Sequence, residues 1–132
     1  NVIDSGTLLN AKPSKALIKN VFYPKTPLHD GAMVIRNGKI LAAGCILPLT
    51  KKQLNTRFGT RHRAAVGLTE ESDAIVVVVS EETGSISVAR NGVLTSDISD
   101  GELRDILMST FIPSGSSSDD KIITRLVRRM KK

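Results

Sequence analysis

Residues 74–79, Ala74-Ile75-Val76-Val77-Val78-Val79, form an unbroken apolar run in which five of the six side chains are β-branched. A run of this kind is typical of a strand that is buried on both faces, because a strand with one exposed face alternates apolar and polar residues. The stretch therefore predicts the central strand of a sheet that has helices on both sides.

Strand and helix signals alternate on either side of this run. Segments 32–36 and 39–47 flank Asn37-Gly38, a dipeptide favoured in type I′ hairpin turns because both positions need positive φ. The pattern indicates one α/β domain with a mixed central β-sheet flanked by helices. We further expect strands at 7–9, 85–89 and 93–94 around a tight turn at 91–92, and helices from a Ser14 cap to about Phe22, from a Thr60 cap to about Glu71, and from Ser99 or Asp100 to about Phe111.

Length and composition fit a folded domain. The chain has 132 residues, of which 40% are hydrophobic and 24% charged, and this excludes a disordered, collagen-like or disulfide-rich chain. Cys45 is the one cysteine, so no internal disulfide forms and a reducing setting is favoured. The sequence has no run of 18 apolar residues and no signal-peptide pattern. Since it begins at Asn1, we expect an excised domain.

The net charge of +6 is concentrated at one end. Residues 1–120 contain 13 basic and 13 acidic side chains, whereas residues 121–132 add six basic ones and no acid. We expect a folded body at 1–112, a Ser/Gly/Asp linker at 113–120 and a basic amphipathic helical tail at 121–132, which would serve as a packing or disordered end or as a membrane- or partner-docking helix. With a neutral body and four aromatic residues, no nucleic-acid partner is expected.

The segment Gly59-Thr60-Arg61-His62-Arg63 places two arginines in the first turn of an expected helix. The helix dipole disfavours a cation there by about 0.3–1 kcal/mol, whereas a phosphate would accept the unpaired N–H groups and pair with both guanidiniums. The segment thus predicts an anion site. The alternative is that both arginines point into solvent or reach an acid elsewhere, and His62 alone would be an ordinary exposed histidine.

Two acidic segments complete the candidate chemistry. His29-Asp30-Gly31-Ala32 precedes a strand and can present a carboxylate at the sheet edge, although Asp-Gly is also common turn chemistry. Ser80-Glu81-Glu82 follows the Val-rich strand, where carboxylates can hold Mg²⁺ or Mn²⁺ beside phosphates, or simply form a solvated turn. Together the segments suit a metal nucleoside triphosphate, and the sequence has neither a P-loop nor a Rossmann motif.

In their order and spacing, segments 27–32, 59–65 and 80–88 resemble the diadenylate cyclase (DAC) domain over about residues 1–111. That family joins two ATP into cyclic di-AMP and releases two pyrophosphates. The Leu28-His29 lead-in is most similar to the membrane-anchored bacterial type, which implies a cytoplasmic domain tethered to the inner face of the cell membrane. The resemblance also implies a regulatory membrane protein and phosphoglucosamine mutase as partners.

The resemblance implies a role for each matching residue. Asp30 would assist the ribose 3′-hydroxyl, with Gly31 allowing close backbone approach, and Leu47 would read the adenine edge. Ile46 stands where relatives often have Tyr, a departure from the family pattern. The implied catalytic residues are Asp30, Gly31, Arg61 and Arg63; the nucleotide-binding residues are Ala32, Leu47, Thr60, Arg61, His62, Arg63, Ser80 and Glu82; and the ligands for Mn²⁺ or Mg²⁺ are Glu82, His29 and Asp30.

One domain offers one triphosphate site, but a cyclic dinucleotide needs two phosphodiester bonds. A face-to-face homodimer about a twofold axis is the symmetric solution, and we expect it to be the active species. The alternative function is a module that binds ATP or cyclic di-AMP without turnover.

Overall fold

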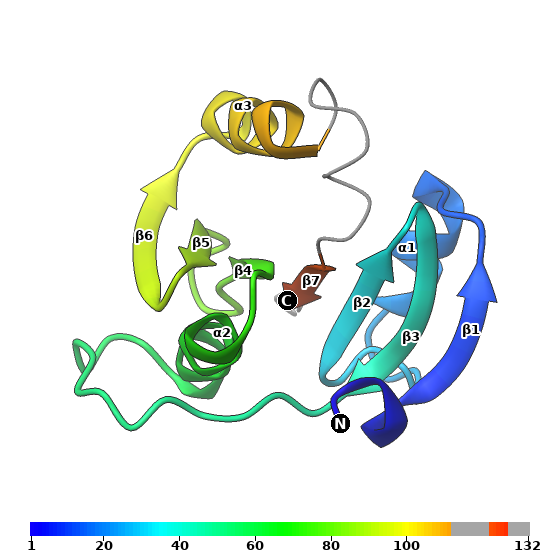
Figure 1. Ribbon diagram of the computed structural model, residues 1–132, viewed down its shortest axis with the longest axis horizontal. Helices are drawn as coiled ribbons and strands as arrows, with labels where there is room; N and C mark the ends of the chain where they lie inside the picture. The colour runs from blue at the N-terminus through cyan, green and yellow to red at the C-terminus, as the bar shows by residue number, and fades with distance from the viewer. Residues whose placement is uncertain (112–121, 127–132) are drawn as a thin grey trace.

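The computed structural model describes residues 1–111 and 122–126, which form a mixed seven-stranded sheet with helices on both faces (Figure 1). In chain order the elements are a 3-10 helix η1 (Ile3–Ser5), β1 (Thr7–Ala11), α1 (Lys15–Val21), β2 (Ala32–Arg36), β3 (Lys39–Cys45), α2 (Thr60–Glu71), β4 (Ile75–Val79), β5 (Ile86–Arg90), β6 (Val93–Ile98), α3 (Asp100–Phe111) and β7 (Ile122–Leu126). The expected α/β class with a mixed, helix-flanked sheet is confirmed.

The sheet consists of two antiparallel three-stranded halves joined by β7, in the order β1-β3-β2-β7-β4-β5-β6. β7 pairs antiparallel with β2 and parallel with β4. The expectation of a helical appendage is therefore wrong for Ile122–Leu126. A strand in this slot supplies partners to backbone groups on the inner edges of both halves, which a detached helix would leave unpaired. Residues 112–121, including the expected linker, and 127–132 lie outside the described residues.

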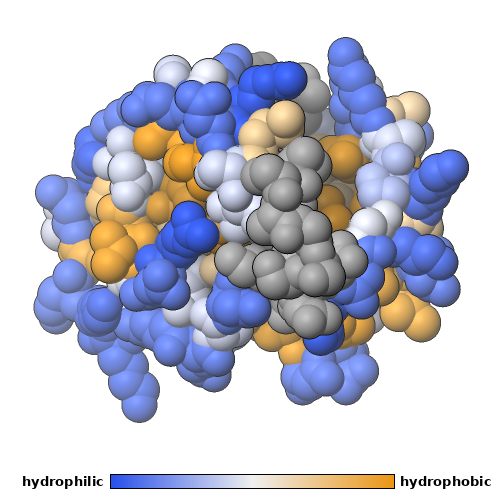
Figure 2. Space-filling model, turned by 45° about the horizontal axis from the view of Figure 1, so that its top comes forward, coloured by the Kyte–Doolittle hydropathy of each residue, from blue (hydrophilic) through white to orange (hydrophobic). Residues whose placement is uncertain are grey.

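The Val-rich strand is buried on both faces, as predicted. Val76 and Val78 of β4 belong to a core cluster shared with α2, while Ile75 and Val77 belong to another that includes side chains of α3. All four side chains are at most 1% exposed. Figure 1 shows α2 on one side of β4 and β5 and α3 on the other. On the face shown in Figure 2, hydrophilic residues lie around most of the rim, with hydrophobic patches between them.

The other half of the sheet repeats this arrangement with α1. Met33 of β2 and Ile40 of β3 pack against the end of α1 near Phe22, whereas Val34 turns to the cluster that contains α2. The β2–β3 turn has φ of 53° at Asn37 and 75° at Gly38, which confirms the predicted hairpin.

Two of the predicted helix caps are confirmed and one is wrong. The Ser14 Oγ accepts from the N–H of Leu17 at 3.0 Å, and the Ser99 Oγ accepts from the N–H of Glu102 at 3.1 Å. At α2, however, the cap is Gly59, whose extended backbone makes Thr60 the first helical residue. Because glycine has no side chain to accept a hydrogen bond, the start of α2 has no side-chain cap.

Helix α2 lies unusually close to the segment that precedes it. A Cβ added at Gly67 would overlap the carbonyl oxygen of Pro48 and would lie 2.8 Å from the carbonyl carbon of Leu49. The N–H of Thr50 also donates to the carbonyl oxygen of Arg63 at 3.0 Å. These two contacts fix α2 against the chain that enters it.

We predict that Gly67→Ala lowers the free energy of unfolding. Alanine favours a helix by about 1 kcal/mol over glycine, but overlap with backbone in a packed core costs about 1–3 kcal/mol. Gly101→Ala in α3 is the control, because the nearest atom to its added Cβ is the Ser99 Oγ at 3.9 Å. Urea denaturation of both variants checks this. Equal stability of Gly67→Ala and the wild type would contradict the close packing.

Candidate active site

Two adjoining cavities meet at the start of α2. One has a volume of about 370 Å³ and the other about 520 Å³, and Thr60 and Arg61 line both. A ligand that extends from one cavity into the other would therefore pass Thr60, the first residue of α2, and Arg61.

Two segments distant in sequence, residues 56–62 and 80–82, line the smaller of these cavities, which we call the polar cavity. The loop before α2 supplies Thr56 and Arg57, and the turn after β4 supplies Ser80, Glu81 and Glu82. The uncapped start of α2 borders the same space, and first-turn N–H groups of a helix point outward along its axis. These N–H groups with guanidiniums beside them make a site for an anion such as phosphate.

The larger cavity, which we call the apolar cavity, lies toward the β2–β3 half of the sheet. Asp30 and Gly31 line it, together with a more apolar wall. Gly31 has φ of +101°, and an added Cβ would lie 2.7 Å from the Cys45 carbonyl oxygen, so only glycine fits there. The remaining lining residues are Pro27, Gly44, Cys45, Ile46, Leu47, Leu49 and Ala64. A wall of this composition with one carboxylate suits a base and its ribose.

An ion pair holds Arg61 between the two cavities. Its Nη1 lies 3.4 Å from the Oε1 of Glu81, and the side chains are 18% and 47% exposed. Glu81 was not among the predicted site residues, although its neighbours Ser80 and Glu82 were. Its carboxylate balances a cation that the start of a helix would otherwise disfavour.

His62 is buried, contrary to the expectation of an ordinary exposed histidine. It is 7% exposed, and its ring centroid lies 4.8 Å from that of Phe58. Burial lowers the pKa of His62, and the charges of Arg61 and Arg57 lower it further. The imidazole is therefore neutral at pH 7, with one nitrogen that donates and one that accepts.

The structure brings together most of the predicted site residues. Asp30, Gly31 and Leu47 share the apolar cavity with Thr60 and Arg61, and the polar cavity gathers Thr60, Arg61, His62, Ser80 and Glu82.

Three predicted residues line neither cavity. Ala32 is fully buried in β2. Arg63 lies two residues after Arg61 in α2 and is exposed. His29 is held in its loop, with Nδ1 2.6 Å from the Thr26 carbonyl oxygen.

The expected set of metal ligands does not form one site in this chain. Asp30 lines the apolar cavity and Glu82 the polar one, and within residues 1–111 and 122–126 no three His, Cys, Asp or Glu side chains are grouped to hold a metal ion. A single carboxylate such as that of Glu82 is enough for an ion that arrives on nucleotide phosphates. Mg²⁺ in such sites takes one or two carboxylates and completes its coordination shell with phosphate and water.

Arg57 and Thr56 are the main lining residues that sequence reasoning missed. They lie in segment 50–59, whose polar composition shows no periodicity. The one available signal is a basic residue two positions before Gly59, and this says nothing of which way its side chain points.

The chain matches the family model described as "DisA bacterial checkpoint controller nucleotide-binding" (DAC) over residues 1–94. It is 47% identical over 110 residues to "Cyclic di-AMP synthase CdaA" of Bacillus subtilis and 48% identical over 111 residues to "Diadenylate cyclase" of Listeria monocytogenes, in each case covering 83% of this chain but 40% and 41% of the relative. The chain thus spans less than half the length of these curated relatives.

Two solved structures are also similar. A cysteine double mutant of DacA from Staphylococcus aureus superposes with a TM-score of 0.79 at 47% identity, covering 82% of this chain and 73% of that one. A "hypothetical membrane spanning protein" from Bacillus cereus superposes with a TM-score of 0.69 at 51% identity, covering 72% and 47% respectively.

The buried, neutral state of His62 predicts an acid sensitivity. Because the folded protein lowers the pKa of His62, the unfolded chain takes up a proton first as the pH falls below about 6.5. The His62 contribution to stability is therefore present above pH 6.5 and is lost as the pH falls toward the folded-state pKa. We expect His62→Gln to flatten the decline of unfolding free energy between pH 7 and 5.

Urea denaturation at a series of pH values measures this slope. His29→Gln, which replaces the other histidine of the chain, shows how much of the change any histidine substitution causes. A His62→Gln slope as steep as that of the wild type would contradict the assignment.

Proposed function

This chain belongs to the DAC domain family, and from that premise we propose that it is the catalytic domain of a diadenylate cyclase, which condenses two ATP into cyclic di-AMP and releases two pyrophosphates. The observation that carries the proposal is the junction of the two cavities at Thr60 and Arg61, with the Asp30 carboxylate on the apolar side and the Ser80 to Glu82 turn on the polar side.

One ATP spans both cavities in this proposal. The base and ribose occupy the apolar cavity, where the Leu47 backbone reads the adenine edge, and the triphosphate extends past Thr60 and Arg61 into the polar cavity. Charge-assisted hydrogen bonds from Arg61 and from backbone N–H groups at the start of α2 hold the phosphates. Ile46 is 72% exposed at the rim of the apolar cavity and offers the base an aliphatic surface.

The chemistry joins each ribose 3′-oxygen to the α-phosphorus of the other nucleotide and breaks the bond from that phosphorus to pyrophosphate. The hydroxyl proton leaves as the new bond forms, and in this proposal the exposed carboxylate of Asp30, which lines the apolar cavity, accepts it. Arg61 pairs with the negative charge that develops on the reacting phosphate. A divalent ion carried on the phosphates, Mg²⁺ or Mn²⁺ with Glu82 as a protein ligand, would add further charge stabilisation there.

The two nucleotides must react with each other, so we propose that two copies of the domain face each other about a twofold axis. Each copy then presents the ribose of its own nucleotide to the α-phosphate held by its partner. Holding both nucleotides in this orientation supplies the proximity that the reaction needs.

In the full-length protein we propose that this domain lies on the cytoplasmic side of a membrane anchor. The similarity to a "hypothetical membrane spanning protein" from Bacillus cereus supports such a tether. No helix among the described residues combines the length and the apolar content that crossing a bilayer requires. A regulatory membrane protein and phosphoglucosamine mutase are the further partners that the family implies.

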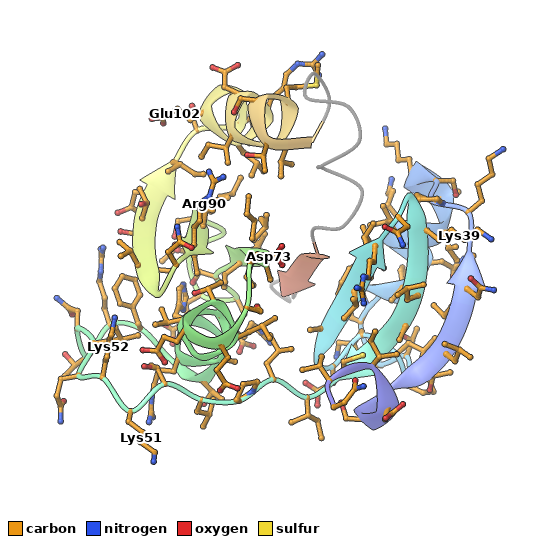
Figure 3. All side chains as sticks on the ribbon, in the orientation of Figure 1. Lys39, Lys51, Lys52, Asp73, Arg90 and Glu102 are labelled. Atoms are coloured by element: carbon orange, nitrogen blue, oxygen red, sulfur yellow. The ribbon has the colours of Figure 1, made fainter. Side chains whose placement is uncertain are left out.

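We predict that the purified protein with ATP and Mn²⁺ or Mg²⁺ yields cyclic di-AMP. The Asp30→Asn variant should form this product at least about 100-fold more slowly, because it loses the proton acceptor, while it still binds ATP. Mass spectrometry of the product and calorimetric titration with ATP check the two parts. Asp73→Asn, on the exposed residue before β4 labelled in Figure 3, is the matched control. ATP binding without product in the wild type would favour the non-catalytic module instead.

The dimer proposal predicts that activity per protomer falls on dilution. Below the dimer dissociation constant a monomer binds ATP but has no second nucleotide to react with. Initial rates across a dilution series, alongside sedimentation velocity, measure this. Constant activity per protomer at concentrations where sedimentation shows only monomer would contradict the dimer.

A further inference from the structure

Arg57 lines the polar cavity but not the apolar cavity, and it also borders a third hollow. Beyond the polar cavity lies a smaller hollow of about 200 Å³, which runs toward β6 and reaches Asp97. Arg57 lines both spaces, together with His62, Ser80 and Glu82. A triphosphate whose first phosphate lies at Arg61 would therefore extend toward Arg57.

Arg57 is held at the β6 side by weak contacts. Its Nη2 donates to the Ser96 Oγ at 2.9 Å, and its Nη1 lies 3.5 Å from the Asp97 Oδ2. The side chains of Arg57 and Asp97 are 55% and 61% exposed, so solvent screens this ion pair. A bidentate guanidinium–phosphate pair is stronger than such a surface contact, and a phosphate would therefore compete well for Arg57.

The backbone of β6 supports the same interpretation independently. Asp97 has φ of +57°, a left-handed conformation that Asp and Asn adopt more readily than most residues, and pairing with β5 is irregular between Ile86 and Val88. An irregularity of this kind changes the direction in which a strand aims its side chains. Here the residue with positive φ is the one whose carboxylate meets Arg57 at the end of the hollow.

Charge in the polar cavity also favours a second cation for the ligand. Arg61 is already paired with Glu81, and Glu82 adds another negative charge to the lining. The charges of both Arg57 and Arg61 lower the pKa of His62, so both guanidiniums act on the same part of the site.

We infer that Arg57 binds the terminal phosphates of the nucleoside triphosphate and the pyrophosphate that leaves, and that Asp97 is its partner while the site is empty. This rests on the proposed function and deepens it. It divides the triphosphate between two arginines, with Arg61 near the reacting phosphate and Arg57 on the leaving group.

Calorimetric titration of the whole chain with ATP, AMP and inorganic pyrophosphate tests the inference. We expect Arg57→Gln to weaken ATP and pyrophosphate binding by about tenfold or more, the scale of a lost hydrogen bond to a charged group, and to change AMP binding less than twofold. Lys51→Gln, on an exposed lysine of the same loop that points outward in Figure 3, removes an equal charge and should leave all three affinities unchanged.

Asp97→Asn separates a binding role from a structural one. Asparagine tolerates positive φ, so the backbone is kept while the ion pair to Arg57 is lost. If Asp97 is only a partner for the empty site, ATP binding is unchanged or tighter. If Arg57 serves only to tie its loop to β6, Asp97→Asn weakens ATP binding as Arg57→Gln does, and the inference fails.

Two other results would overturn it. Unchanged ATP affinity in Arg57→Gln, or equal loss of ATP and AMP affinity, would remove Arg57 from the terminal phosphates while leaving the cyclase function intact. A wild-type chain that binds neither ATP nor pyrophosphate would instead reject the proposed function, and the role of Arg57 with it.

Discussion

The close packing of Gly67 against the backbone of Pro48 and Leu49 sets the position of α2, and the rest of the site depends on that position. The same helix packs on β4, so its start is held between the buried centre of the sheet and the segment that follows β3. Both cavities open at that start. A shift of α2 along its axis would move Thr60 and Arg61 relative to Asp30 and would separate the base site from the phosphate site.

This placement puts positively charged arginines beside the start of α2, where the helix dipole disfavours cations. An uncapped helix start with arginines beside it lacks the acceptors that helices normally have there, and Glu81 supplies part of the compensation through Arg61. Asp97 does the same for Arg57. Both acids are at least 47% exposed, so a phosphate can replace them at low cost. The site therefore has the charge arrangement of an anion site, with carboxylates as weak substitutes for a phosphate.

Features that depend on neighbouring residues could be predicted from the sequence, and features that depend on distant packing could not. The Asn37-Gly38 hairpin, the Ser14 cap and the buried run at 74–79 are encoded locally, and the motif residues Asp30, Thr60, Arg61 and Ser80 line one or both of the cavities. The burial of His62 and the direction of Arg57 depend on the loop at 50–59, which has no regular pattern. The pattern at Ile122–Leu126 predicts a helix because its apolar residues suit both periodicities, and only pairing with β2 and β4 makes the segment a strand.

In all of these proposals one nucleotide spans both cavities across the start of α2. A crystal structure of the chain with a non-hydrolysable ATP analogue tests it most directly. We predict electron density for the base beside Leu47, for the ribose beside Asp30, and for the triphosphate along Thr60, Arg61 and Ser80. Density for the triphosphate outside the polar cavity, or for the base at the β6 end, would contradict this arrangement.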